Sequence, residues 1–346
     1  MKKTSKLTML LMVSASMMAF AACSNSSDTS DASGNSGASN GGENSKLTFT
    51  GTPYTVLDDN EGGSMGPDKT YVYFGDWPQS EIEEGVTVDE TKSVEQGEFI
   101  YYKGDDDAWY AKYSNHYYKV EPIKWCVLDT NKKLLLADKI IINCPYYTYC
   151  EVNRIINSKT IYPNNYEYSR IRAYLNGLSY QKQISDEAEM ETDSSYFDKG
   201  FLQTAFTNTL QTAIATTTVV NDARSTFPDK ATFDDETFNN GNNMYSSETS
   251  TSDKLFLLSE QEVTNSDYGF SAYNVNGVER KRKVTAFAKE NGTSVTDDEG
   301  NGYWCLRPPY YKYCDAVWRV YSDGSADTST QTYGKQPGVV PALCLK

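Results

Sequence analysis

The sequence predicts an α+β fold for a folded body that begins near Leu47. Strand-like segments rich in β-branched and aromatic residues come first, helical spacing is confined to the middle, and strand-like segments return at the end. Strands and helices are therefore segregated along the chain and do not alternate as βαβ units, which is typical of an α+β protein. A hydrophobic fraction of 38% in 346 residues supplies enough apolar side chains for a core.

The first half of this body is expected to form strands. Residues 70–74 predict a strand, and the Gly-Asp-Trp-Pro sequence that follows predicts a turn that ends it. Two further pairs of strands are separated by polar turns at 104–107 and 130–132. The strands predicted for these pairs are residues 99–103, 109–120, 123–129 and 133–142.

Helical patterns occur only in the middle of the chain. Residues 169–175 predict a helix capped by Ser169, and residues 259–263 predict a short helix. Residues 201–214 predict a longer helix, because one face carries Phe201, Leu202, Phe206, Leu210 and Ile214. Polar segments at about 181–196 and 227–252 predict loops, and the last strands are predicted at 303–306, 316–321 and 339–345.

The N-terminus has the layout of a bacterial export signal. Three lysines among the first six residues precede an apolar stretch at 7–20, which is followed by Ala21, Ala22 and Cys23. We expect a signal peptide at 1–22, lipidation of Cys23, a flexible tether at 23–46 and a single domain at 47–346. An ordinary signal peptide with cleavage nearby is the alternative. The expected location is a membrane-anchored lipoprotein of the outer membrane or cell surface.

Charge and composition exclude several classes of function. A net charge of -15 repels phosphate backbones, so no nucleic-acid partner is expected. The only histidine is His116, and no Walker loop, dinucleotide fingerprint, HExxH helix or nucleophile elbow occurs. The acidic runs at 105–107 and 297–299 lack the ligand order of an EF-hand and are interpreted as solvated loops. We therefore expect no enzyme, no catalytic residues, no cofactor and no metal.

The six cysteines after Cys23 leave their pairing open. An even number in an exported protein permits disulfides, with about fifteen possible connectivities, but buried free thiols are equally compatible with the sequence.

The C-terminal segment at about 303–340 differs in character from the rest. Its first thirty residues interleave Tyr and Trp with Ser, Asp and Thr, as antibody paratopes do. This composition predicts a binding face. The alternative is a twisted sheet with one Tyr-rich face. The segment 145–152 resembles 309–317, which we interpret as chance similarity in a Tyr-rich chain, and a second contact loop is the alternative.

Several segments resemble the DUF6273 family, in the expected order, from about residue 70 to the end. They are Tyr-Val-Tyr-Phe-Gly-Asp-Trp-Pro-Gln-Ser at 71–80, Glu-Pro-Ile-Lys-Trp-Cys-Val-Leu at 121–128, Leu-Leu-Leu-Ala-Asp at 134–138, Tyr-Ser-Arg-Ile-Arg-Ala-Tyr-Leu-Asn at 168–176, Lys-Leu-Phe-Leu-Leu-Ser-Glu-Gln-Glu-Val at 254–263, Trp-Cys-Leu-Arg at 304–307 and Gly-Val-Val-Pro-Ala-Leu at 338–343. Two positions depart, because the family usually has Arg where Cys126 stands and Trp where Cys305 stands.

The chain is most similar to a subgroup of spirochaete lipoproteins typified by the Treponema variable protein, whose C-terminal segment is rewritten by a diversity-generating retroelement. The resemblance implies a C-type lectin fold of the formylglycine-generating-enzyme type with loop insertions. It also implies that changeable positions contact ligand. The positions that match are Tyr310, Tyr311, Tyr313, Cys314, Asp315, Trp318, Tyr321, Ser322, Ser325, Asp327 and Ser329.

Scaffold residues are expected between the changeable positions, at Ala316, Arg319, Val320, Asp323, Gly324 and Ala326. The function expected from the resemblance is that of a monomeric surface lipoprotein that binds a protein or another cell-surface molecule. One alternative is a structural or self-associating envelope lipoprotein. The other is a formylglycine-generating-type oxidase that would use Cys305 with Cys314, or Cys344 with a partner.

Overall fold

The computed structural model is built on a long antiparallel pair of strands, β2 (Tyr71–Glu81) and β6 (His116–Asp129). The structure describes residues 47–58, 62–147, 153–183, 190–193, 196–222, 226, 250–273, 275–310, 313–326, 328–334 and 337–346. Strands predominate over helices in these residues. The strands support the α+β prediction at the level of a strand-rich chain with few helices. The predicted signal peptide and tether lie outside the described residues.

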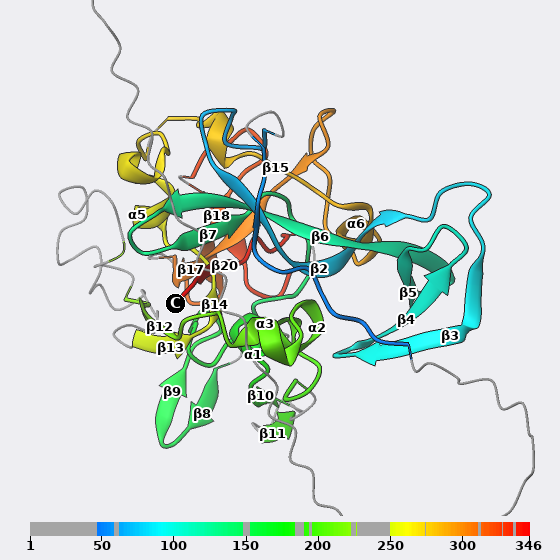
Figure 1. Cartoon of the computed structure of the whole chain (residues 1–346). Helices are drawn as coiled ribbons and strands as arrows, with labels where there is room; N and C mark the ends of the chain where they lie inside the picture. Colours follow the sequence, from blue (N-terminus) through cyan, green and yellow to red (C-terminus); the bar gives the residue numbers. More distant parts are fainter. Residues whose placement is uncertain are drawn as a thin grey trace, which may run out of the picture. The chain divides into compact units, whose positions relative to one another are not determined.

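Nine strands of the described chain form one sheet, in the order β14-β20-β7-β6-β5-β4-β3, with β2 on β6 and β1 on β2. All its pairs are antiparallel. Figure 1 shows β3, β4 and β5 extending beyond the rest of this sheet as an arm. The bounds not yet given are β1 Thr55–Val56, β3 Val88–Gln96, β4 Phe99–Gly104, β5 Trp109–Tyr113, β7 Leu134–Ala137, β14 Leu255–Phe256 and β20 Ala342–Cys344.

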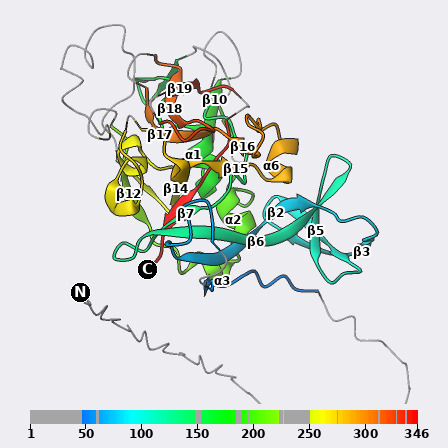
Figure 2. The same cartoon turned by 90° about the horizontal axis from the view of Figure 1, so that it is seen from above.

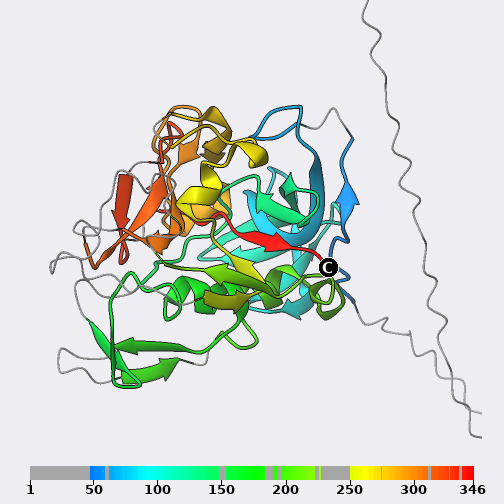
Figure 3. The ribbon, with the colours of Figure 1, turned by 90° about the vertical axis from the view of Figure 1, so that its left-hand side faces the viewer.

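The C-terminal strand lies inside the central sheet, next to its edge strand β14. β20 lies between β7 and β14, and Leu343 is opposite Leu135 on one side and Leu255 on the other. Figure 3 shows this red strand entering the body among strands from earlier in the chain. Residues 46–346 consequently form a single compact unit.

Smaller elements surround the central sheet (Figure 2). The remaining sheets, of two or three strands each, are β8–β9, β10–β11, β12–β13, β15–β16 and β17–β18–β19.

Within the described residues, no helix has both the length and the apolar character needed to cross a membrane. The helices are α1 Arg170–Asn176, α2 Phe201–Ala205, α3 Asn208–Gln211, α5 Glu260–Val263, α6 Ala286–Glu290 and the 3₁₀ turns η1 Ser266–Tyr268 and η2 Val278–Arg280. The remaining strands are β8 Arg154–Ile156, β9 Lys159–Ile161, β10 Tyr180–Gln183, β11 Met190–Asp193, β12 Thr217–Val220, β13 Ser250–Asp253, β15 Arg282–Lys283, β16 Asn301–Gly302, β17 Trp304–Pro309, β18 Ala316–Val320 and β19 Thr328–Gln331.

Aromatic side chains fill the core between β2 and the helices. The Trp77 ring lies 4.7 Å from Phe201 and 6.0 Å from Phe287, measured between ring centroids. Trp125 is fully buried, and its indole nitrogen donates to the carbonyl of Phe74 at 2.8 Å. Buried aromatic rings of this kind contribute large apolar areas together with specific edge-to-face contacts.

The starts of two helices predicted from the sequence are confirmed. Ser169 caps α1 by accepting a hydrogen bond from the backbone of Arg172. Ser259 caps α5 in a capping box with Glu262, in which each side chain bonds the other residue's backbone. The predicted turn at 130–132 is also confirmed, between β6 and β7.

Four predictions of element bounds were wrong. The turn expected at 75–78 is part of β2, which continues past a register irregularity between Tyr73 and Asp76. The strand expected at 109–120 is two strands, β5 and β6, which turn at residues 114–115. The strand expected at 133–142 ends at Ala137, with only isolated bridges beyond. The helix expected at 201–214 is divided into α2 and α3, because Phe206 adopts an extended backbone.

The two predicted loops are only partly described. In the loop expected at 181–196, β10 and β11 pair with each other, so those residues form a hairpin. In the loop expected at 227–252, the residues from 250 onward belong to β13, and residues 227–249 lie outside the described residues.

Candidate functional site

The C-terminal segment is held by the three-stranded sheet β17–β18–β19. In its register, Trp304 is opposite Val320, and Trp318 is opposite Ser329. The pairing of β17 with β18 is irregular between Cys305 and Pro309. Most of β17 and β18 is buried, so the sheet forms a rigid base and the segments that connect its strands reach the surface.

The predicted ligand-binding positions do not share one environment. Tyr313 is exposed, with 58% of its surface accessible. Trp318 and Ser322 are buried, at 2% and 4% exposure, so neither side chain lies on the surface. Tyr311 and Asp327 lie outside the described residues. The partly exposed positions are Tyr310, Cys314, Asp315, Tyr321, Ser325 and Ser329.

Trp318 instead supports an aromatic cluster beneath the surface. The Tyr310 ring packs edge-on against it, with 4.5 Å between centroids, and the Tyr273 ring does so at 6.4 Å. Tyr313 stacks on the outer side of this cluster, 6.0 Å from Tyr310. An exposed tyrosine is therefore held against a buried aromatic base, which reduces the conformational entropy that it would lose on binding.

A second group of aromatic residues surrounds Arg319. The Tyr303 and Tyr321 rings are stacked at 5.9 Å, and the Arg319 guanidinium lies 4.9 Å from each ring centroid. The cation–π contacts keep Arg319 along the ring faces. Arg319 was expected to be a scaffold residue, and this position agrees with such a role.

A loop that the sequence analysis missed lies beside the predicted segment. The backbone of Gly277 donates to the carbonyl of Gly324 at 3.2 Å, and the Asn276 amide donates to Asp323 at 3.1 Å. Gly324 has φ +86°, and a Cβ there would lie 2.0 Å from the carbonyl oxygen of Gly277, so only glycine permits this approach. The predicted scaffold role of Gly324 thus has a physical reason.

This second loop exposes apolar side chains. Val275 is 48% exposed and Val278 is 69% exposed. We define the candidate binding face as the described surface residues of 310 and 313–325 together with the loop 275–278. Two valines in a short Gly- and Asn-containing run are a weak signal, and no pattern in the sequence joins them to Asp323.

One buried arginine holds the two loops together. Arg280 has no accessible surface and donates to the carbonyls of Gly324 (2.7 Å) and Ser271 (2.7 Å), and also to those of Val275 and Val263. Its guanidinium has five N–H donors in a planar arrangement, which suits several carbonyls at once.

Residues from the middle of the chain support the face from behind. The Asn164 amide donates to the carbonyls of Tyr313 (3.0 Å) and Ala316 (3.2 Å). The Tyr146 hydroxyl donates to the carbonyl of Arg307 at 2.6 Å, and both Tyr146 and Tyr147 are buried. A second contact loop at 145–152, the alternative to chance similarity, would therefore not include these two tyrosines, and residues 148–152 lie outside the described residues.

Three buried cysteines lack the features of an activated thiol. Cys126, Cys144 and Cys305 are buried thiols outside any disulfide. Burial raises the pKa of Cys126 to about 11 and the pKa values of Cys144 and Cys305 to about 12. Reactive cysteines have lowered pKa values, so these three are typical of structural residues. Cys23 and Cys150 lie outside the described residues.

The acidic runs have local hydrogen-bond partners. Asp105 accepts from Thr87, Asp106 accepts from Tyr110, and Asp297 accepts from Asn301. His116 is exposed at the start of β6. Among the described residues, no group of three or more His, Cys, Asp or Glu side chains is placed to hold a metal ion.

Comparison with known proteins gives one family. Residues 130–346 match the family model described as a domain of unknown function, DUF6273. No curated protein and no solved structure matches the chain. The candidate face, its supporting arginine and Asn164 all lie inside the matched residues.

Proposed function

Since this chain belongs to the DUF6273 family, we propose that its family domain is a binding module, displayed on a lipid-anchored surface protein, that holds a protein or another cell-surface molecule on the candidate binding face. The observation that carries the proposal is Tyr313. It is 58% exposed and stacked on Tyr310, which in turn packs on buried Trp318. Interface hot spots are enriched in aromatic residues presented in this way.

The division between buried and exposed positions adds to the argument. Four of the expected scaffold positions, Ala316, Val320, Gly324 and Ala326, are buried, whereas Tyr313, Tyr321 and Ser325 reach the surface. Changes at the surface positions would leave the sheet beneath them intact, which is the requirement for a diversifiable face. The C-type lectin subtype and diversification by a retroelement remain parts of this proposal and follow from the resemblance.

The proposal is tested with a random-peptide library displayed on phage and selected on the immobilised full-length protein. We expect Tyr313→Ala to weaken binding of the selected peptides by about tenfold or more, because truncating an aromatic hot spot costs about 2 kcal/mol or more. Tyr54→Ala is the matched control, since Tyr54 is 45% exposed but lies outside the family match. If both variants bound the peptides as well as wild type does, the proposal that this face is the binding surface would be wrong.

The membrane anchor is a separate part of the proposal. Cys23 directly follows Ala21-Ala22 and precedes a polar tether. We expect wild-type protein expressed in a bacterium to fractionate with membranes and to incorporate a radiolabelled fatty acid, because acyl chains bind bilayers. Cys23→Ala should abolish the label and move the protein into the soluble exported fraction. Membrane association that persists without label would instead indicate another anchor.

Self-association through the same face is the second candidate function, because exposed Val275 and Val278 add apolar area to it. Sedimentation velocity across a concentration series distinguishes the two. A monomer at all concentrations agrees with the first proposal, whereas a dimer that Val278→Ser abolishes agrees with the second. We propose no oxidase activity, because burial raises the pKa of the Cys305 thiol to about 12.

A further inference from the structure

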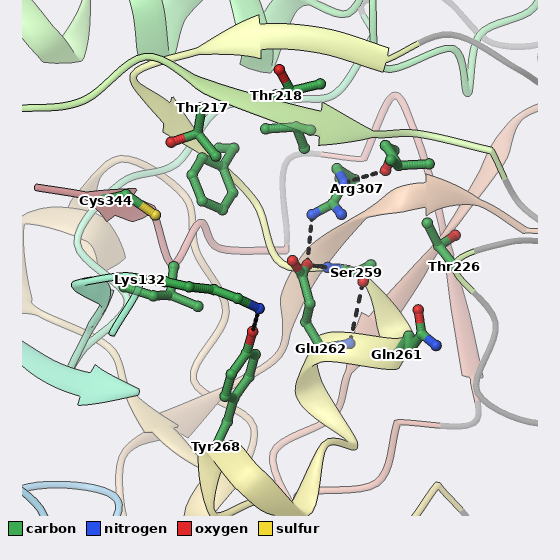
Figure 4. A pocket seen from close by; sticks show the side chains of 14 residues that line it. Lys132, Thr217, Thr218, Thr226, Ser259, Gln261, Glu262, Tyr268, Arg307 and Cys344 are labelled. Atoms are coloured by element: carbon green, nitrogen blue, oxygen red, sulfur yellow. Dashed lines mark hydrogen bonds and ion pairs between the residues drawn. The ribbon is translucent and has the colours of Figure 1, made fainter. Parts of the chain in front are cut away.

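A pocket of about 390 Å³ lies beside β12 and α5, away from the residues that define the candidate binding face. Its walls come from β12, the turn before β7, the start of α5, β17 and β20 (Figure 4). Every element that lines it belongs to the part of the chain that matches the family. The volume is at the small end of the range for small-molecule sites, about 300–1,000 Å³.

One wall carries a carboxylate that is held in place by an arginine. The Arg307 guanidinium donates to Oε2 of Glu262 at 2.8 Å, and the Ser259 backbone donates to the same oxygen at 2.6 Å. Arg307 is itself held by the carbonyls of Val220 (2.8 Å) and Leu257 (2.6 Å). Among the described residues, no donor reaches Oε1 of Glu262, and the side chain is 28% exposed. Figure 4 shows this carboxylate directed into the pocket.

The carboxylate stays ionised at neutral pH. Burial opposes its ionisation, but the Arg307 charge and the hydrogen bonds from Ser259 outweigh burial and lower the pKa of Glu262. An ionised carboxylate with an open oxygen can accept a charge-assisted hydrogen bond from a ligand ammonium.

A positive charge stands at the mouth of the pocket. Lys132 is 65% exposed, and its ammonium donates to the Tyr268 hydroxyl at 2.8 Å. Within the described chain its acidic neighbour is Asp129, at 3.8 Å, and it forms no ion pair with Glu262. An ammonium has three N–H donors, so Lys132 retains donors for a ligand carboxylate.

Part of the pocket lining is apolar. Leu134, Val219 and Phe256 form this part, and each is only 3% exposed. The pocket therefore combines an anionic group, a cationic group and an apolar surface within one small volume. These three features match the ammonium, the carboxylate and the side chain of one kind of small molecule.

We propose that this pocket binds a free α-amino acid with an apolar side chain, with its ammonium on Glu262, its carboxylate on Lys132 and its side chain against Phe256. The site is independent of the binding face, so the failure of either proposal leaves the other standing.

Isothermal calorimetry on the purified full-length protein tests the proposal with leucine, isoleucine, valine, methionine and phenylalanine. We expect at least one to bind. Its N-acetyl derivative, which lacks the ammonium, and its amide, which lacks the carboxylate, should each bind at least about tenfold more weakly, a difference of about 1.4 kcal/mol. Lys132→Met should weaken binding of the amino acid by a similar factor. It should not weaken binding of the amide any further.

Lys124→Met is the matched control, because Lys124 lies over Tyr71 much as Lys132 lies over Tyr268, at 5.1 and 5.4 Å from the ring centroids. This variant should bind the amino acid as wild type does. The proposal would be overturned if none of the five amino acids gave a binding heat at millimolar concentration. An amide that binds as well as the free acid would also overturn it, and would indicate a peptide N-terminus as the ligand.

Discussion

Arg280→Met is expected to lower the free energy of unfolding by about 3–5 kcal/mol, which is the range for removing one partner from a buried charged network. The side chain is fully buried, and its hydrogen bonds end on carbonyls from three separate segments. Methionine fills a similar volume but donates nothing, so these carbonyls would lose the hydrogen bonds from Arg280 inside the protein. Urea unfolding followed by circular dichroism measures the change.

Lys281→Met is the matched control for this loss. Lys281 is the next residue, also cationic, but its contact is a surface ion pair with Glu299 at 3.4 Å. Exposed pairs of this kind contribute about 0–1 kcal/mol, so this variant should unfold close to wild type. If both variants lost equal stability, the effect would come from overall charge and not from the buried donors.

Arg280→Met also has a local consequence at the candidate binding face. The side chain bonds Gly324 on one loop and both Ser271 and Val275 on the other. Without it, amide hydrogen exchange should accelerate in residues 271–277 and 321–326 under conditions in which β2 and β6 stay protected, since local opening needs less free energy than global unfolding. Unchanged exchange in these loops would show that Gly277 and Gly324 suffice to join them.

The elements predicted correctly from sequence are those with a local cause. Ser169 and Ser259 each bond backbone groups within three residues, so a short window of sequence contains the whole interaction. Phe206 and Gly75 show the opposite case. Phe206 breaks the predicted helix and packs against Phe74 with 5.0 Å between centroids. Gly75 has φ +72°, and a Cβ there would meet the Phe206 ring at 2.5 Å, so its glycine serves a packing contact within β2 and not a turn.

The same distinction applies to the candidate site. The Tyr-rich composition and the resemblance located the segment and several of its scaffold positions. They did not distinguish the exposed Tyr313 from the buried Trp318, because the burial of Trp318 depends on Tyr310 and Tyr273, which pack against its indole. The loop 275–278 was missed because its contact with Asp323 and Gly324 joins residues far apart in the sequence, through one side-chain amide and one backbone N–H that leave no local pattern.

A buried ion pair between α1 and β13 gives the other large expected effect. Arg172 donates to Asp253 at 2.8 Å, with side-chain exposures of 16% and 0%. Arg172 also donates to the carbonyl of Glu167, and Asp253 accepts from Thr251 at 2.6 Å. Arg172→Met should lower the free energy of unfolding at pH 7 by about 3–5 kcal/mol, because the Asp253 charge would remain buried without its cation.

The pH dependence of that loss identifies its cause. Burial already raises the pKa of Asp253, against the opposing effects of Arg172 and Thr251, and removing Arg172 should raise it further. A carboxyl group whose folded pKa exceeds its unfolded pKa stabilises the fold only while protonated, and that stability is lost as the pH rises through the folded pKa. The deficit of Arg172→Met relative to wild type should therefore be largest at neutral pH and smallest below the unfolded pKa of about 3.9.

The double variant Arg172→Met with Asp253→Leu completes the test, because it removes both charges and replaces them with apolar side chains of similar size. Such replacements of buried pairs are often neutral or stabilising, so the double variant should recover most of the loss at pH 7 and lose the pH dependence. If it were instead as unstable as the single variant at every pH, the interaction between α1 and β13 would depend on the shape of these side chains and not on their charges.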